Sequence, residues 1–391
     1  MKKNYKAGRH LLQIPGPTNV PDRILRAMDY PTIDHRGEEF FNLAKKCLSG
    51  IKDIFKTENH VIIYPASGTG AWEAALVNTL SPGDTVLMVE TGHFASLWVK
   101  LARRLGLNAE LIETNWRRGA EPEKIAERLS SDKTGKIKAV CIVHNETSTG
   151  AMSDVFKVRQ CIDDVGHSAL LMADTISSLA SSDFCHDEWG VDVTVSGSQK
   201  GLMLPPGLSF NAISEKAWGA YEKSTLPRSY WDWGEHITSN STGAFPYTPA
   251  TNLLFGLNEA ILMLKEEGLD NVFLRHKRHA EATRLAVQTW GLEVLCENKN
   301  DFSNTLTAVL LPDGHNADNL RSIVLDKFDM ALGNGLSRLA GKVFRIGHLG
   351  DFNDLMLVAT LGGIEMGLAN SSVPHQVGGT QAAMQFLKQN S

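Results

Sequence analysis

The chain has 391 residues, of which 42% are hydrophobic and 21% are charged, and this length allows two or three domains around a large core. Its formal net charge of −5 at pH 7 and its pI near 6.2 offer no basic surface to nucleic acid or anionic lipid. We therefore expect small-molecule partners, with no nucleic acid and no membrane.

The ends of the chain and its cysteines indicate the compartment. No apolar run approaches the roughly eighteen residues of a membrane span, the N-terminus lacks a signal-peptide core, and the final LKQNS is not a peroxisomal signal. The five cysteines are scattered and never in C-x-x-C spacing, which favours reduced thiols over a disulfide framework or a zinc site. We expect a cytoplasmic protein without a metal.

The chain begins with an expected N-terminal arm, residues 1–20, whose turn QIPGPTNVP contains three prolines that forbid a continuous helix. Short apolar runs then alternate with helical patterns, from HVIIYP and AWEAALVNTL as far as VDVTVS. This alternation predicts an α/β fold with a mostly parallel sheet and helices on both faces.

A helix expected over residues 251–267 presents leucine and isoleucine on one face and stops at Gly268. We expect it to end a large domain that spans residues 21–268. The strand-like runs GLEVLCE, NTLTAVLLP and KVFRIGHLG lie among further helical patterns, so residues 269–391 are expected to form a smaller α+β domain.

Three local patterns carry chemistry. In YPASGTGAWEAALVNTL a strand leads through Ser67-Gly68-Thr69-Gly70 into a helix, whose free N–H groups suit a phosphate. Asp174 ends the buried run LLMAD and is either a helix cap or a functional group at the ligand-binding edge of the sheet. Lys200 follows the strand VDVTVS and precedes the apolar GLMLPPGL.

An ordinary lysine is solvated at the surface, but the flanks of Lys200 leave little water for an ammonium. A desolvated amine is a nucleophile that can form a Schiff base. A phosphate cradle, a carboxylate for a ring nitrogen and an amine for an aldehyde together indicate pyridoxal phosphate.

The sequence also resembles a known family. The segments QIPGPTNVP, SGTGAWEAALVNTLSPGD, HNETSTG, ADTISSL, SGSQKGLMLPPGLSF, PYTPATNLLFGL and GKVFRIGHLG resemble the class V aminotransferases, in the serine-glyoxylate and alanine-glyoxylate branch. The likeness is collinear from about residue 12 to 350. It implies the aspartate aminotransferase fold, fold type I, and a homodimer with shared active sites.

The resemblance implies a role for each matched residue. The phosphate would be bound by Ser67, Gly68, Thr69 and Gln199, and by Tyr247 and Thr248 of the partner subunit. Phe94 would stack on the cofactor ring, where several relatives have tryptophan, and Thr147 would bind the ring hydroxyl. Asp174 would pair with the pyridine nitrogen, and Lys200 would form the Schiff base and move the Cα proton. Arg345 would hold the substrate α-carboxylate with a planar fork.

The expected reaction moves an amino group to glyoxylate, giving glycine and a 2-oxo acid, with L-serine as the favoured donor and hydroxypyruvate as its product. Aspartate and alanine remain open as donors, because one side chain more or less in a small pocket changes specificity by only about 1–3 kcal/mol. A class V lyase or desulfurase is an alternative, although ALGNGLSRLAGK contains no cysteine. A phosphate-ligand binding protein without a catalytic lysine is another.

Further polar and aromatic residues have open roles. His35 either lies near the site or is a buried core histidine, and His93 either contributes to the site or only packs. Trp231 and Trp233 are candidates for a site wall or an interface, and Arg228 is a candidate for a second anion contact.

Overall fold

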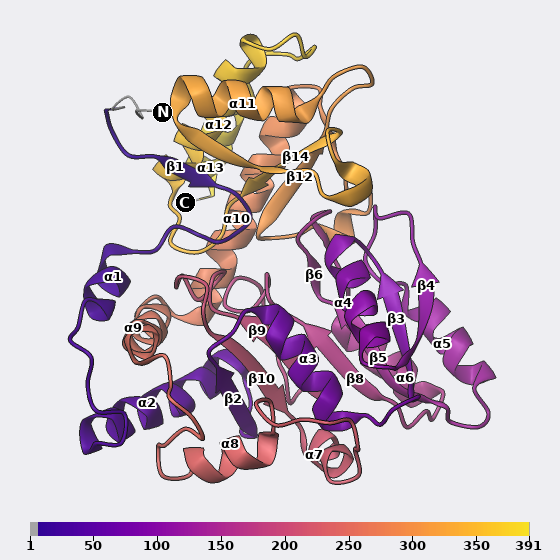
Figure 1. Ribbon diagram of the computed structural model, residues 1–391. Coiled ribbons are helices and arrows are strands. Elements are labelled where there is room, and N and C mark those ends of the chain that lie inside the picture. Colours follow the sequence, from indigo (N-terminus) through magenta and orange to yellow (C-terminus); the bar gives the residue numbers. More distant parts are fainter. Residues whose placement is uncertain (1–6, 391) are drawn as a thin grey trace.

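A seven-stranded sheet forms the centre of the larger part of the chain (Figure 1) in this computed structural model, which describes residues 7–390. Residues 1–6 of the expected arm therefore lie outside the described residues. The strands follow the spatial order β2 (His60–Tyr64), β10 (Ser209–Ile213), β9 (Val193–Gly197), β8 (Leu170–Asp174), β5 (Ile137–Val143), β3 (Thr85–Glu90) and β4 (Asn108–Glu113). Only β10 runs antiparallel to its neighbours in this sheet, so the prediction of a mostly parallel sheet is confirmed.

Alternate residues of each strand enter two separate cores, because side chains of a strand point to opposite faces in turn. In β2, Val61 and Ile63 face one core and Ile62 and Tyr64 face the other. The first core packs against α1 (Asp22–Met28), α2 (Glu38–Phe55), α5 (Pro122–Ser131), α6 (Val155–Asp164) and α9 (Thr251–Glu267). The second packs against α3 (Gly68–Thr79), α4 (His93–Arg104), α7 (Glu215–Tyr221) and α8 (Trp233–Asn240).

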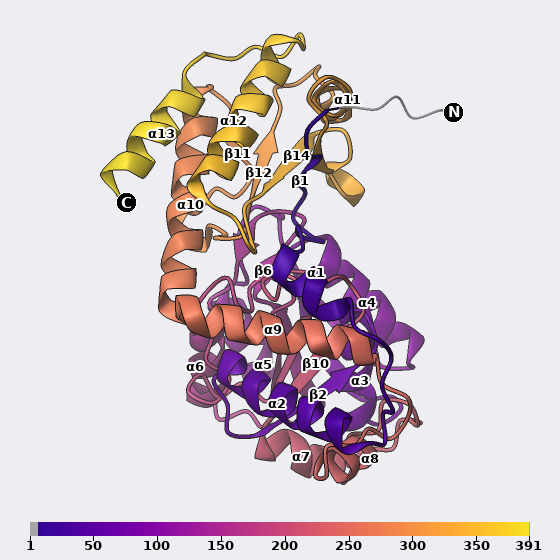
Figure 2. The ribbon, with the colours of Figure 1, turned by 90° about the vertical axis from the view of Figure 1, so that its left-hand side faces the viewer.

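The predicted helix over residues 251–267 is α9, and it buries Leu254, Leu257, Ile261 and Leu264 as expected from their spacing. Gly268, at a φ of 82°, separates α9 from α10 (Leu269–Thr289). This left-handed conformation is one that glycine adopts without strain. Figure 2 shows α10 turning away from α9 and running up beside the smaller part of the chain.

The smaller part is built on a five-stranded sheet in the order β1 (Leu11–Gln13), β13 (Met330–Asn334), β14 (Val343–Gly347), β12 (Leu306–Leu310) and β11 (Glu293–Val294). Its core includes side chains of α10 and of three further helices, α11 (Ala317–Phe328), α12 (Asp354–Ala369) and α13 (Gly379–Gln389). Short 3₁₀ turns cover Lys299–Asp301 and Ser337–Leu339.

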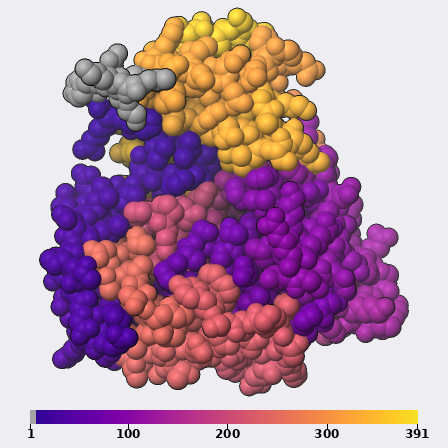
Figure 3. Space-filling view, in the orientation of Figure 1, coloured from indigo at the N-terminus to yellow at the C-terminus, as the bar shows by residue number. Residues whose placement is uncertain are grey.

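Strand β1 belongs to the N-terminal arm, which the sequence analysis interpreted only as a turn. It pairs in parallel with β13, more than 300 residues later in the chain, for example Leu12 with Ala331. Figure 3 shows the indigo N-terminal residues lying against the orange C-terminal part on this face. The arm therefore connects the smaller part of the molecule to the region of the large sheet.

The strand order brings chemistry-bearing loops together. Strand β8 lies between β5 and β9, and all three run in parallel, so the loops that leave their carboxyl ends meet at one edge, where ligands bind in such sheets. A two-stranded hairpin, β6 (Asn145–Glu146) and β7 (Ala151–Met152), follows β5 at this edge. Within residues 7–390, no helix is both long enough and apolar enough to cross a membrane.

Candidate active site

A cavity of about 250 Å³ opens at the carboxyl edge of the large sheet. Eight of the ten residues that the sequence analysis assigned to the cofactor line it: Ser67, Gly68, Thr69, Phe94, Thr147, Asp174, Gln199 and Lys200. They come from the carboxyl end of one strand, β8, and from loops and helix starts that follow other strands of the large sheet. Segments more than 130 residues apart in the sequence therefore share one small space.

The phosphate cradle is the start of α3. Ser67 is the N-cap residue in extended conformation, and its side chain does not cap the helix, which leaves N–H groups of the first turn free for an anion. A Cβ atom on Gly68 would lie 2.2 Å from Cδ1 of Ile176. A larger residue here would therefore have to displace the side chain of Ile176, which also lines the cavity.

Asp174 is held by two donors at the end of β8 and is only 3% exposed. The backbone N–H of Ile176 donates to its Oδ1 at 2.7 Å, and the indole N–H of Trp72 donates to its Oδ2 at 3.0 Å. Burial raises the pKa of the Asp174 carboxyl to about 7, although these two donors act in the opposite direction. Asp174 is thus aimed into the cavity and is not the cap of a following helix.

Lys200 is 7% exposed and lies in the same cavity. Burial, and then the positive charge of Arg345, lower the pKa of its ammonium to about 7. The amine is therefore available as a neutral nucleophile near neutral pH, as the apolar flanks of Lys200 predicted.

The N-terminal arm covers Lys200. The Lys200 ammonium donates to the carbonyl of Pro15. The backbone N–H of Thr18 donates to the carbonyl of Gln199, and the Thr18 hydroxyl donates to that of Lys200. A Cβ atom on Gly16 would lie 2.4 Å from Cδ of Lys200, and Gly16 has a φ of +96°. The arm thus forms one wall of the cavity, a role that the sequence analysis did not assign to it.

Thr147 and Arg345 lie together beside the cavity. The Arg345 guanidinium donates from Nη1 to the carbonyl of Thr147 at 2.8 Å and from Nε to that of Asn334 at 2.7 Å. Burial lowers the pKa of Arg345 to about 10, so it stays charged at neutral pH. Thr147 lines the cavity itself, and its Oγ1 lies 2.5 Å from Oγ of Ser177.

Phe94 is presented by the first turn of α4, which a buried carboxylate holds in place. Glu146 accepts hydrogen bonds from the backbone N–H groups of Phe94 and Ala95 at 3.4 and 3.1 Å, and from the Ser148 hydroxyl at 2.6 Å. A carboxylate at a helix N-terminus is stabilised by the free N–H groups and by the helix dipole. Glu146 therefore fixes the helix that places Phe94 against the cavity.

Asn145 is a lining residue that the sequence analysis missed. It is 2% exposed, and neither its side-chain oxygen nor its side-chain nitrogen has a partner among the described residues. Buried amides are almost always hydrogen-bonded, so this pair of atoms indicates a bound polar group. Its position two residues before Thr147 in HNETSTG was the available signal, since alternate residues of an extended segment share a face.

Two of the assigned residues, Tyr247 and Thr248, do not line the cavity. The Tyr247 hydroxyl contacts the ring of His236 at 2.5 Å and the carbonyl of Tyr230, and its ring stacks on that of Tyr230. Thr248 is exposed. Neither residue is brought to the site of its own chain.

The remaining open candidates separate into packing residues and neighbours of the cradle. Arg228 bonds to Asp232 and lies over the Tyr221 ring, so its guanidinium is engaged away from the cavity. Trp233 is buried in the core.

Trp231 packs against Gly70 of the phosphate cradle, where a Cβ atom would meet its ring at 2.7 Å. His35 and His93 do not line the cavity.

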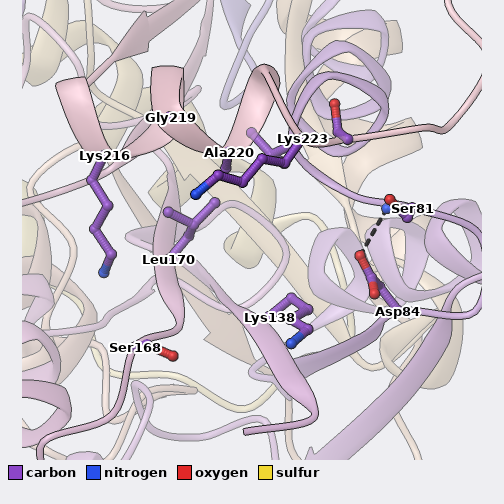
Figure 4. Close-up of a pocket in the computed structure, with 11 residues that line it drawn as sticks. Ser81, Asp84, Lys138, Ser168, Leu170, Lys216, Gly219, Ala220 and Lys223 are labelled. Atoms are coloured by element: carbon purple, nitrogen blue, oxygen red, sulfur yellow. Dashed lines mark hydrogen bonds between the residues drawn. The ribbon is translucent and has the colours of Figure 1, made fainter.

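A larger cavity, of about 490 Å³, lies at the opposite edge of the sheet, where β3, β5 and β8 begin (Figure 4). Three lysines line it: Lys138 of β5, Lys216 of α7, and Lys223 of the turn after α7. Lys138 and Lys216 donate to backbone carbonyls, of Gly135 and Ala169. None of the residues singled out by the sequence analysis lies here, so size does not identify the active site.

Comparison with known proteins decides the family. The pattern described as aminotransferase class-V matches residues 11–338. This chain belongs to the class V aminotransferases. The class V aminotransferase is 47% identical to a serine–glyoxylate aminotransferase of Methylorubrum extorquens, over 100% of this chain and 99% of the relative. It is 43% identical to an L-aspartate–glyoxylate aminotransferase of Paracoccus denitrificans, over 97% and 96%.

The structure of pyridoxamine–pyruvate aminotransferase from Mesorhizobium loti superimposes on this aminotransferase with a TM-score of 0.92 at 25% identity, covering 99% of this chain and 100% of that one. The fold is thus the type I fold of the class V aminotransferases, as expected. The protein is an enzyme that depends on pyridoxal phosphate.

The residues at the cavity fit this cofactor. Gln199 Oε1 and both polar side-chain atoms of Asn145 are buried without a hydrogen-bond partner within residues 7–390, as expected of groups that meet a polar ligand. The free N–H groups at the start of α3 suit its phosphate, and Asp174 and Lys200 suit its ring nitrogen and its aldehyde.

Proposed function

We propose that this class V aminotransferase transfers the amino group of L-serine to glyoxylate and produces hydroxypyruvate and glycine. The observation that carries the proposal is the distribution of charge at the cavity. Lys200 is the cation among the described residues that line the cavity. Arg345 lies beside the cavity and donates a hydrogen bond to the carbonyl of Thr147, which is a lining residue. The chain thus offers one guanidinium, enough for one α-carboxylate, and favours a donor with an uncharged side chain.

The residue roles are part of the proposal. Ser67, Gly68, Thr69 and Gln199 bind the phosphate, Phe94 covers the ring, and Thr147 binds the ring hydroxyl. Pyridoxal phosphate supplies an aldehyde that bonds covalently to an amine and a ring that accepts electrons from the substrate Cα. Asp174 keeps the ring nitrogen protonated, because a carboxylate nearby favours the charged form of the nitrogen.

Lys200 moves the proton. With a pKa of about 7, its amine accepts a proton from the donor Cα and returns one at neutral pH, as a general base and then a general acid. Arg345 fixes the α-carboxylate and so determines which Cα bond lies where it can break. The arm over Lys200 excludes water from this step.

The assembly, location and domain boundaries of the enzyme are also part of the proposal. Tyr247 and Thr248 lie away from the cavity of their own chain, which leaves them for the phosphate of a partner subunit, so we propose a homodimer with shared sites. We propose a cytoplasmic location, and an arm over residues 1–20, a large domain over 21–268 and a small domain over 269–391.

The test of the donor is spectroscopic. The holoenzyme receives L-serine, L-aspartate or L-alanine, and glyoxylate is added last while the visible band of the bound cofactor is recorded. The expected result is that serine bleaches the band with the highest kcat/KM and glyoxylate restores it. Lys200→Ala, which lacks the amine, is expected to lose both the band and turnover, by at least about 10²-fold. Serine without effect would contradict the proposal.

A second candidate donor is L-aspartate, because the L-aspartate–glyoxylate aminotransferase of Paracoccus denitrificans is 43% identical to this chain. Its side-chain carboxylate needs a cation beyond Arg345, so a lower KM for aspartate than for serine would show that the partner subunit supplies one.

A desulfurase needs a cysteine at the substrate, and none of the five cysteines lines the cavity. A non-catalytic binding protein predicts that Lys200→Ala leaves function intact.

A further inference from the structure

We propose that Trp72 is a positioning residue: its indole N–H holds the Asp174 carboxylate in the orientation and ionised form that the ring nitrogen of the cofactor requires. The inference rests on the proposed role of Asp174. No chemistry was assigned to Trp72 from the sequence, where it occupies an ordinary apolar position of helix α3.

The hydrogen bond is buried and specific. Trp72 is 2% exposed, lines the cavity, and donates from Nε1 to Oδ2 of Asp174 at 3.0 Å. The other oxygen, Oδ1, accepts from the N–H of Ile176 at 2.7 Å. With one donor on each oxygen, the carboxylate plane is fixed, and a charge-assisted bond in a dry setting is stronger than the same bond in water.

The charges around Asp174 make this donor important. Burial favours the neutral carboxyl, and the negative charge of Glu146 acts in the same direction, whereas the Ile176 N–H, the Trp72 indole and the positive charge of Lys200 favour the ionised carboxylate. With the cofactor bound, the Lys200 amine would be engaged by its aldehyde and would no longer act as a free ammonium. The Ile176 N–H and the Trp72 indole would then remain as the protein's own donors to the carboxylate.

The position of Trp72 is itself fixed by a second tryptophan. Its ring stacks on that of Trp98 from α4, with 5.7 Å between centroids and 11° between planes. The Nε1 atom of Trp98 is buried without a hydrogen-bond partner among the described residues. Helix α3 therefore carries the phosphate cradle at its first residues and, within two turns, the donor for Asp174.

The two tryptophans give a matched pair of variants. Trp72→Phe and Trp98→Phe each replace an indole in the same stack by a phenyl ring, but only the first removes a donor from Asp174. Asp174→Asn serves as the positive control for the role of the carboxylate. Each apoenzyme is titrated with pyridoxal phosphate from pH 6 to 9, and the dissociation constant and the pH at which binding weakens are measured, with thermal unfolding as a check of folding.

The expected result is that Trp72→Phe weakens cofactor binding roughly tenfold and raises the pH below which binding weakens by roughly one unit. Trp98→Phe keeps the Trp72 donor and a ring stacked on it, so we expect a smaller loss of affinity and no shift in that pH. Equal shifts in both phenylalanine variants would mean that only packing was lost and would overturn the inference. An unchanged Trp72→Phe beside a weakened Asp174→Asn would overturn it as well, and would leave the role of Asp174 standing. If Asp174→Asn also binds normally, the proposed role of Asp174 fails and the inference fails with it.

Discussion

Asp174 and Lys200 lie in one buried cavity, and burial displaces their pKa values in opposite directions until both are about 7. Each group would be more stable neutral in this setting, since desolvation penalises either charge. The apoenzyme therefore carries a destabilised site at neutral pH. The cofactor relieves it, because it bonds to the amine and offers a ring nitrogen to the carboxylate.

A stability prediction follows for Asp174→Asn in the apoenzyme. Between about pH 4 and 7 the folded state keeps a proton on Asp174 that the unfolded chain has released, so folding stability falls as the pH rises through this window. The asparagine removes this loss, and we expect the variant to be more stable by on the order of 2 kcal/mol at pH 8. Urea unfolding at pH 4 and pH 8 measures it. Equal effects at the two pH values would contradict it.

Asn145 provides a second prediction at this scale. Since its amide atoms have no hydrogen-bond partner in the part of the chain that the structure describes, Asn145→Ala removes no hydrogen bond seen there. We expect the free energy of unfolding of the apoenzyme to change by less than about 1 kcal/mol. Binding of the cofactor or the donor should weaken by about 1–3 kcal/mol. Cofactor titration and KM for serine show which of the two contacts Asn145. If neither changes, the amide contacts no ligand.

At the scale of elements, strand-to-helix connections build the site. The start of α3 provides the cradle, and the start of α4 provides Phe94 with Glu146 bound beneath its first turn. Both helices pack on the same face of the sheet, and the Trp72–Trp98 stack joins them. A shift of either helix would therefore move the phosphate cradle and the ring contact together.

Gly68→Ala tests how closely this face is packed. The new Cβ atom would lie 2.2 Å from Cδ1 of Ile176, so the isoleucine, which lines the cavity, would have to move. We expect cofactor affinity to fall by about 1–3 kcal/mol. The double variant Gly68→Ala/Ile176→Val, which lacks the clashing methyl group, should recover part of the loss. Equal affinities for the single and double variants would show that the clash is not the cause.

At the scale of the whole molecule, the arm links distant parts. Strand β1 is bound to the small sheet through β13, while the residues that follow, Pro15 to Thr18, cover Lys200 on the large sheet. One short segment therefore contacts both the small sheet and the wall of the cavity. In the proposed dimer, the partner subunit would add to the phosphate side of the cavity.

Sharing of sites between subunits predicts complementation. In a mixed dimer of Lys200→Ala and Tyr247→Ala chains, one site would lose both functions and the other would have neither defect. Co-expressed, doubly tagged chains should then show about half of the wild-type kcat per dimer, above either variant alone. If Tyr247 serves its own chain, each site of the mixed dimer keeps one defect, and activity per dimer is about half that of the Tyr247→Ala enzyme.

The sequence alone determined the features that depend on residues close together in the chain. Alternating apolar runs and helical patterns predicted the sheet, because both periods are set by the backbone, and the helix at 251–267 was found with its end at Gly268. Local motifs indicated Ser67, Gly68, Thr69, Asp174 and Lys200, and the resemblance to the family added Phe94, Thr147 and Gln199. All eight line the cavity, because the carboxyl ends of parallel strands meet at one edge.

Tertiary structure decided the contacts between residues that are far apart in the chain. The Trp72 indole meets Asp174 across 102 positions, and the Lys200 ammonium meets Pro15 across 185. Strand β1 has only three residues, too few for a pattern, and is defined by its pairing with β13. The side-chain amide of Asn145 has no hydrogen-bond partner among the described residues, and this too depends on which segments pack around it. Such facts depend on distances in the folded chain, which no local period of the sequence encodes.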